Sequence, residues 1–157
     1  MKIQNSLFLH IAILCLSFFS YGKTAQAQSF TVRTTAYTHS EADHLIYGKS
    51  TASGTQLRAE QKYTSAAADW SRFPLGTTFR IKGDSTIYVV DDYGIALVGT
   101  STIDIYRPSK KAMNNWGVRE VRIEILKIGD VERSRKILKS RSNFGFVKSM
   151  HRSMSRS

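Results

Sequence analysis

Three aspartates lie in unusually apolar stretches of this 157-residue chain, where their carboxyl groups could perform acid–base chemistry. Asp69 follows the alanines at 66–68, Asp92 ends the apolar stretch that starts at Ile87, and Asp104 lies between two isoleucines. A carboxylate in such surroundings is costly unless it has a partner, and carboxyls with perturbed acidity often mark active sites. The three aspartates are therefore candidates for catalysis.

Asp104 is the candidate whose orientation follows most directly from the sequence. Successive side chains of a strand point to opposite faces, so Ile103 and Ile105 would share one face, and Asp104 would share the other with Tyr106. The isoleucines are expected in the core, which turns Asp104 toward a cleft or toward solvent. The spacing alone leaves both a functional group and an ordinary surface aspartate open.

The elements that would position these groups are predicted to be short strands. Alternating polar and apolar residues separated by turn residues predict six strands and one short helix. The strands are expected at Ser29–Thr38, Lys62–Ala67, Thr77–Ile81, Thr86–Val90, Ile103–Tyr106 and Val118–Leu126, and the helix at Pro108–Trp116. This pattern indicates an all-β domain, a small barrel or sandwich, over residues 28–127.

The N-terminal residues 1–27 have the layout of a secretory signal peptide. Lys2 precedes an apolar run at 7–19, and small residues at Ala25 and Ala27 suit a signal peptidase. The run is shorter than the roughly 20 residues that a membrane-spanning helix needs. We therefore expect export to the periplasm, the cell wall or the medium. The single cysteine, Cys15, would be removed with the signal.

The C-terminal segment 128–157 is basic and is expected to be a partly disordered tail. Asp130 could cap a helix from Val131 to about Ser140, and Met150–Ser157 are expected to be disordered. Without residues 1–27 the chain would hold 21 Lys and Arg against 12 Asp and Glu, a net charge of +9. The tail could bind an anionic wall polymer or membrane surface, or could simply aid solubility. Nucleic acid is not an expected partner, because the strands carry no interleaved basic and aromatic residues.

Metal or cofactor chemistry is not expected. The polar stretch from His39 to His44 matches no zinc-binding spacing, and the domain has no cysteine to support one. No serine lies in a Gly-x-Ser-x-Gly turn either.

Several segments, taken together and in order, resemble the bacterial three-aspartate (3D) domain family of cell-wall enzymes. The similar segments are 35–38, 51–54, 67–69, 74–77, 88–94, 103–106 and 116–119. The chain departs from the family pattern at Ile95 and Val98, where glycine and lysine are usual. The resemblance covers roughly residues 31–126 and implies a six-stranded double-psi β-barrel.

The resemblance also implies roles for individual residues. Asp104 falls on the catalytic acid/base, and Asp92 and Asp69 fall on the two supporting aspartates. Thr35 and Tyr37 fall on the strand that lines the substrate groove. Glu41 falls near a position that is often polar in the small members of the family and is also an expected substrate contact. Tyr93 and Tyr106 are expected substrate contacts as well, because a sugar could pack on their rings.

The implied activity is that of a peptidoglycan lytic transglycosylase. Such an enzyme cuts the β-1,4 bond between N-acetylmuramic acid and N-acetylglucosamine and leaves a 1,6-anhydro sugar. One carboxyl suffices, because the 6-hydroxyl of the sugar itself attacks. Two alternatives remain open: a hydrolase that uses a second carboxylate to activate water, and a non-catalytic wall-binding module that would not need Asp104.

Overall fold

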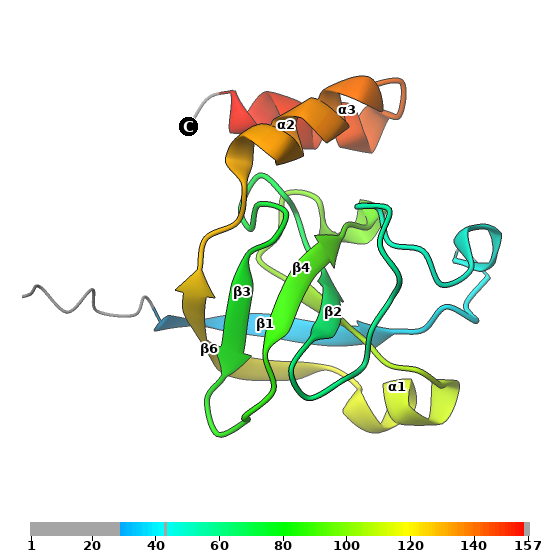
Figure 1. Cartoon of the computed structure of the whole chain (residues 1–157), viewed down its shortest axis with the longest axis vertical. Coiled ribbons are helices and arrows are strands. Elements are labelled where there is room, and N and C mark those ends of the chain that lie inside the picture. Colours follow the sequence, from blue (N-terminus) through cyan, green and yellow to red (C-terminus); the bar gives the residue numbers. More distant parts are fainter. Residues whose placement is uncertain (1–28, 43, 156–157) are drawn as a thin grey trace, which may run out of the picture.

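The computed structural model describes residues 29–42 and 44–155. The predicted signal peptide, residues 1–27, lies outside the described residues. The described part holds a six-stranded mixed sheet that closes on itself in the order β1-β5-β2-β4-β3-β6 (Figure 1). The strands are β1 Ser29–Tyr37, β2 Thr64–Ala67, β3 Thr78–Ile81, β4 Tyr88–Asp92, β5 Ile103–Tyr106 and β6 Arg119–Lys127.

The predicted strands and the helix after Pro108 are confirmed to within a few residues, but an all-β domain with one helix was wrong. The described residues form three α-helices, with short 3-10 turns at Leu45–Tyr47 (η1) and Ile95–Leu97 (η2). The α-helices are α1 Lys110–Trp116, α2 Val131–Ser140 and α3 Gly145–Met154. Asp130 caps α2 as expected, since its side chain accepts from the Arg133 N–H at 2.8 Å.

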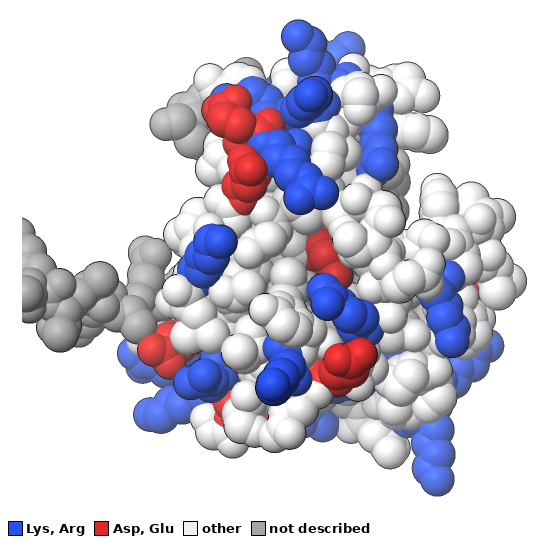
Figure 2. All heavy atoms as spheres, viewed as in Figure 1, with Lys and Arg blue, Asp and Glu red and all other residues white. Residues whose placement is uncertain are grey.

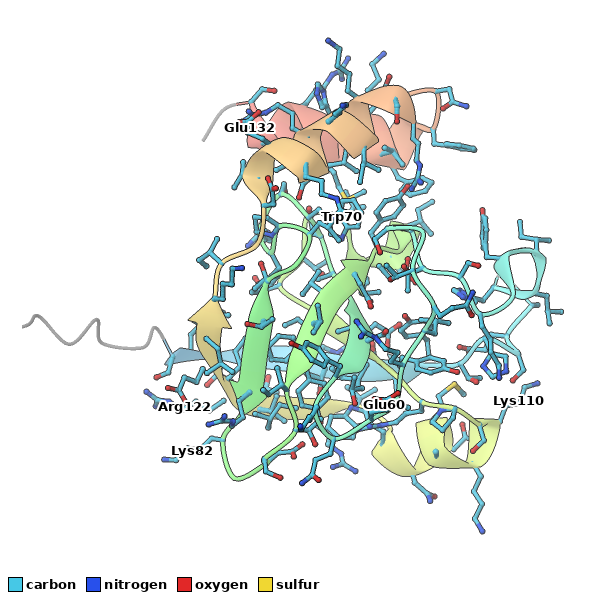
Figure 3. All side chains as sticks on the ribbon, in the orientation of Figure 1. Glu60, Trp70, Lys82, Lys110, Arg122 and Glu132 are labelled. Carbon is cyan, nitrogen blue, oxygen red and sulfur yellow. The ribbon has the colours of Figure 1, made fainter. Side chains whose placement is uncertain are left out.

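The C-terminal helices share the core of the closed sheet, which is why residues 150–154 are helical and not disordered. Val147, Met150 and Met154 recur at helical spacing and are buried, so they form one apolar face of α3. Leu138 of α2 is buried in the same cluster. Trp70 lies between the closed sheet and these helices (Figure 3).

The strands contribute the other part of this core from alternate positions. Val90, Ile103, Ile105 and Ile123 are fully buried inside the closed sheet, and Ala66 packs with them. The intervening residues of these strands therefore lie on the opposite face of the sheet.

The connection from β6 to α2 is tied closely to the turn before β3. Gly129 N donates to Thr77 Oγ1 at 3.0 Å, and Asp130 N donates to the Leu75 carbonyl at 2.8 Å. A Cβ at position 129 would overlap the Pro74 and Leu75 carbonyl oxygens and the Thr77 nitrogen. Only glycine fits this crossing, which sets the place where α2 starts.

Basic side chains cover much of the exposed face of the C-terminal helices (Figure 2). Acidic groups gather near the start of α2, where Glu132 lies (Figures 2 and 3). None of the helices in the described residues is both long and apolar enough to cross a bilayer.

Candidate functional site

The site is built around a row of residues that crosses four neighbouring strands. Thr35 of β1 pairs with Asp104 of β5, and Asp104 pairs in turn with Ala67 of β2. Ala67 also pairs with Asp92 of β4. Adjacent strands are about 4.8 Å apart, so the Cα atoms of Asp104 and Asp92 lie about 10 Å apart across Ala67. The two carboxylates thus flank a position that carries only a methyl group.

A β-bulge places the second of these carboxylates. The pairing of β2 with β4 runs from Ala66 with Val90 to Ala67 with Asp92, which leaves Asp91 as the extra residue. A bulge sets two successive residues opposite one, so both carboxyls leave the core face. Asp92 then lies beside Tyr37, and Asp91 lies beside Ser65.

Asp104 is held by the first strand of the row. The Thr35 hydroxyl donates to Asp104 Oδ1 at 2.7 Å, and the carboxyl is partly exposed. Its neighbours Ile103 and Ile105 are fully buried in the core. The strand therefore presents Asp104 on the face opposite to the apolar core.

The phenol group of Tyr37 binds one of these carboxylates, that of Asp92. The hydroxyl donates to Asp92 Oδ2 at 3.2 Å, and its ring lies 5.6 Å from the ring of Tyr106. Burial raises the pKa of Tyr37 well above its usual value, and the negative charges of Asp92, Asp91 and Asp104 raise it further. The phenol therefore stays protonated and acts as a hydrogen-bond donor at every physiological pH.

Asp92 is a buried carboxyl whose two oxygens already accept hydrogen bonds. Oδ1 accepts from the backbone N–H groups of Ala52 and Tyr93, each at 2.9 Å, and Oδ2 accepts from Tyr37. Burial raises the pKa of Asp92, and these hydrogen bonds and the charge of His44 oppose that rise. Asp92 is thus suited to hold the 51–54 loop and Tyr37 in place.

Both carboxyl oxygens of Asp69 accept hydrogen bonds from neighbouring loops. It is 2% exposed, and its Oδ1 accepts from the Ser71 N–H at 2.8 Å and from the Ser71 hydroxyl at 2.7 Å. Its Oδ2 accepts from the Gly99 N–H at 2.6 Å. Asp69 therefore fastens the turn after β2 to the loop that precedes β5, and so positions the strand that carries Asp104.

Of the other predicted contact residues, only Tyr106 packs beside Tyr37; Glu41 and Tyr93 have other partners. Tyr106 lies beside Tyr37, and its hydroxyl is 2.8 Å from His39 Nδ1. Glu41 Oε2 accepts from the Thr38 N–H at 3.0 Å and so stabilises the loop after β1. Tyr93 is turned away, because its ring packs edge-on against Trp70 at 4.9 Å.

Arg141, which was not predicted from the sequence, links the C-terminal helices to the site. Its Nη1 donates to the Ala52 carbonyl at 2.8 Å and to the Tyr93 hydroxyl at 3.1 Å. Ala52 and Tyr93 are the two residues whose N–H groups hold Asp92. No local signal marks Arg141, because its partner Ala52 lies 89 positions earlier.

Asp91 was not among the predicted site residues, because its neighbour Asp92 was preferred for the glycine two positions further on. It is 4% exposed, and burial raises its pKa to about 7. Ser65 donates to Asp91 Oδ2 at 2.8 Å. Two adjacent aspartates at the end of an apolar strand were the only signal for it.

Metal binding finds no geometric support in the described ranges, 29–42 and 44–155. No group of three or more His, Cys, Asp or Glu side chains is arranged there to hold an ion.

Part of the chain is similar in sequence to known proteins. Residues 64–127, which include Asp69, Asp92 and Asp104, match the family model of the 3D domain. Over 100 residues the chain is 33% identical to the cell wall-binding protein YocH of Bacillus subtilis (strain 168). That alignment covers 64% of this chain and 33% of YocH, so the chain spans about a third of the length of this relative.

Proposed function

We propose that the chain acts on bacterial peptidoglycan as a lytic transglycosylase with Asp104 as the general acid and base, and the match of residues 64–127 to the 3D domain supports this. The observation that supports this most is the row Thr35–Asp104–Ala67–Asp92, which flanks a small residue with two carboxylates. The order of the closed sheet, with β1–β5 and β2–β4 as its parallel pairs, supports a double-psi barrel.

The proposed reaction uses one carboxyl twice. Protonated Asp104 gives its proton to the glycosidic oxygen as the bond from that oxygen to C1 of the muramic acid breaks. The ionised Asp104 then takes the proton of the 6-hydroxyl, whose oxygen bonds to C1. The products are a 1,6-anhydro-muramic end and a free hydroxyl on the glucosamine, and Asp104 regains its proton.

The surrounding residues have positioning roles in this proposal. The Thr35 hydroxyl fixes the orientation of the Asp104 carboxyl, and the Tyr37 phenol links the groove to Asp92. Tyr37 and Tyr106 offer adjacent aromatic rings on which a sugar could pack. No step of the reaction requires a cofactor.

Two other functions remain as alternatives with different observations behind them. The name of the relative, a cell wall-binding protein, favours a non-catalytic module that would hold glycan on the Tyr37–Tyr106 pair. A hydrolase would need Asp92 to activate water. The three hydrogen bonds that Asp92 accepts already engage both of its oxygens and leave little room for a water, and this argues against hydrolysis.

The proposed location is the exported side of the cell, in contact with the wall. The signal-like residues 1–27 and the wall-binding name of the relative support it. The basic face of α2 and α3 could add a non-specific attraction to anionic wall or membrane polymers.

The test is digestion of purified peptidoglycan by the chain from residue 28, followed by mass spectrometry. We expect products that end in 1,6-anhydro-muramic acid, and a loss of at least about a thousandfold in rate for Asp104→Asn. Glu60→Gln, which changes an exposed carboxyl in the same way, should digest at the original rate.

Other product patterns would change the assignment. Reducing ends in place of anhydro ends would make the protein a hydrolase. If no product forms and both variants still sediment with the wall material, the binding module replaces the enzyme.

A further inference from the structure

A second cleft, of about 380 Å³, lies between the closed sheet and the start of α2. Its walls come from the loop before β2, the turn before β3, the end of β4 and the connection from β6 to α2. The lining residues that matter here are Arg58, Asp91, Lys127, Asp130 and Arg133. Asp69, Asp92 and Asp104 are not among its lining residues.

The 51–58 loop lies between this cleft and the residues around Asp92. On the side of Asp92, Ala52 N binds its carboxyl, and Leu57 packs with Tyr37 in a small apolar cluster. On the other side, Ser53, Thr55 and Arg58 line the second cleft. The two sites therefore share a wall but have different linings.

Asp91 lies at the floor of the second cleft with one of its oxygens unused. The Ser65 hydroxyl accepts from the Arg58 N–H at 3.0 Å and donates its proton to Asp91 Oδ2. Asp91 Oδ1 is buried and has no hydrogen-bond partner among the described residues. A buried polar atom without a partner is costly, so a ligand or a shift of the Asp91 side chain that gave this oxygen a partner would be favourable.

The charged side chains around the cleft determine whether the ligand should be an anion or a cation. Arg58, Lys127 and Arg133 line it, and none of them forms a salt bridge within the described part of the chain. The facing acid Asp130 is engaged as the cap of α2. The positive charges outnumber the negative ones, so the cleft attracts an anion.

We propose that this cleft binds an oxyanion, a carboxylate or a phosphate carried by a cell-wall polymer, between the three basic side chains and Asp91. The two sources share one chemistry, because both present oxygens that accept from guanidinium and ammonium groups. Binding at this cleft does not depend on cleavage at Asp104.

The protonation state of Asp91 should control the affinity. Burial raises the pKa of Asp91 to about 7, and the neighbouring Asp92 raises it too, while Ser65 and Arg58 oppose the rise. Asp130, Lys127 and Arg133 are the other charged groups that face it across the cleft. Since Ser65 donates to Oδ2, the proton belongs on Oδ1, the oxygen without a partner among the described residues. The ionised form repels an anion, so affinity should fall about tenfold between pH 6 and pH 8.

The experiment is a titration of the ¹⁵N-labelled chain from residue 28, which contains every described residue, followed by two-dimensional NMR at both pH values. Dimethyl phosphate and N-acetylmuramic acid are the probes, and both keep one negative charge over this pH range. We expect shifts at the amides of Ser53, Thr55, Gly76 and Gly129, with N-acetylglucosamine giving none there. Binding of only the phosphate or only the carboxylate probe would identify the source.

Three variants separate this site from general charge attraction. Lys127→Gln and Arg133→Gln should each weaken binding about threefold. Asp91→Asn keeps the hydrogen bond from Ser65 and should bind with the same affinity at both pH values. Lys82→Gln removes an exposed charge from the β3–β4 turn, far from α2, and should bind as the original chain does (Figure 3).

The proposal is overturned if neither probe shifts the cleft amides, or if the shifts fall on Tyr37, Ala67 and Tyr106 instead. It is also overturned if Lys82→Gln weakens binding as much as Arg133→Gln. Should Asp91→Asn lose its dispersed spectrum, the two charge variants still decide the question, because Lys127 and Arg133 are exposed.

Discussion

At the scale of single residues, the aspartates of this chain differ in what their oxygens are bound to. Asp69 and Asp92 accept hydrogen bonds on both oxygens, mainly from backbone N–H groups, and so hold loops. Asp104 is bound by a hydroxyl, and Asp91 keeps one oxygen without a partner in the described residues. Partners, and not the apolar neighbours along the chain, therefore distinguish Asp69 and Asp92, which hold loops, from Asp91, whose Oδ1 has no partner among the described residues.

Asp91 also has a consequence for stability. Its pKa is raised from 3.8 to about 7 in the folded chain, so between these values the folded state binds more protons than the unfolded state. Stability is then lost as pH rises through this range. Asp91→Asn should therefore raise the free energy of unfolding at pH 8 by about 3 kcal/mol, with little gain left at pH 4.

Urea unfolding of both chains at the two pH values measures this difference. An equal effect of Asp91→Asn at pH 8 and at pH 4 would contradict the raised pKa. Asp130→Asn, which removes an exposed carboxyl and keeps an amide cap, is the matched control.

At the scale of elements, α2 reaches the site through the residue that follows it. Arg141 binds the carbonyl of Ala52 and the hydroxyl of Tyr93, and the N–H groups of the same two residues bind Asp92. Arg141 thereby joins the end of α2 to the two backbone segments that bind the Asp92 carboxylate. The basic segment 128–157 therefore anchors a loop of the site through Arg141, in addition to carrying positive charge.

Arg141→Gln should loosen this loop without unfolding the chain. We expect glycan cleavage to fall about tenfold, and hydrogen exchange of the Ala52 and Tyr93 amides to quicken, because their backbone loses its anchor. Arg152→Gln removes an equal charge from an exposed position of α3 and is the matched control. Equal losses in both variants would mean that charge, and not the anchor, supports activity.

At the scale of the whole molecule, the closed sheet and the C-terminal helices form one folded unit. Leu138, Val147 and Met150 are fully buried in the same core as Trp70 and Ile105. The connection that joins the two parts crosses the Pro74–Thr77 turn at Gly129, where no side chain fits. The packing of the whole unit therefore depends on this crossing.

Gly129→Ala should destabilise the whole chain, because its methyl group would overlap three backbone atoms that cannot move independently. We expect a loss of about 3 kcal/mol or more in the free energy of unfolding, measured with urea. Gly145→Ala is the matched control, since a Cβ at the start of α3 would meet nothing within 4 Å. A similar stability for both variants would show that α2 can shift away from the turn without cost.

The sequence by itself determined the parts of this protein that depend on neighbours along the chain. The alternation of Ile103, Asp104 and Ile105 predicted which face Asp104 takes, because the side-chain period of a strand is a local property. The strands and the cap at Asp130 followed from equally local patterns. The site roles that the family resemblance implies still await experiment.

Only the tertiary structure decided what each group touches. The bulge at Asp91 depends on the register between β2 and β4, which no local pattern contains. Tyr93 packs against Trp70, which offers it an aromatic partner. Residues 150–154, which were expected to be disordered, form the second half of α3 because the closed sheet offers its methionines a core. Burial and hydrogen bonds between distant residues decide such features, and these exist only once the chain has folded.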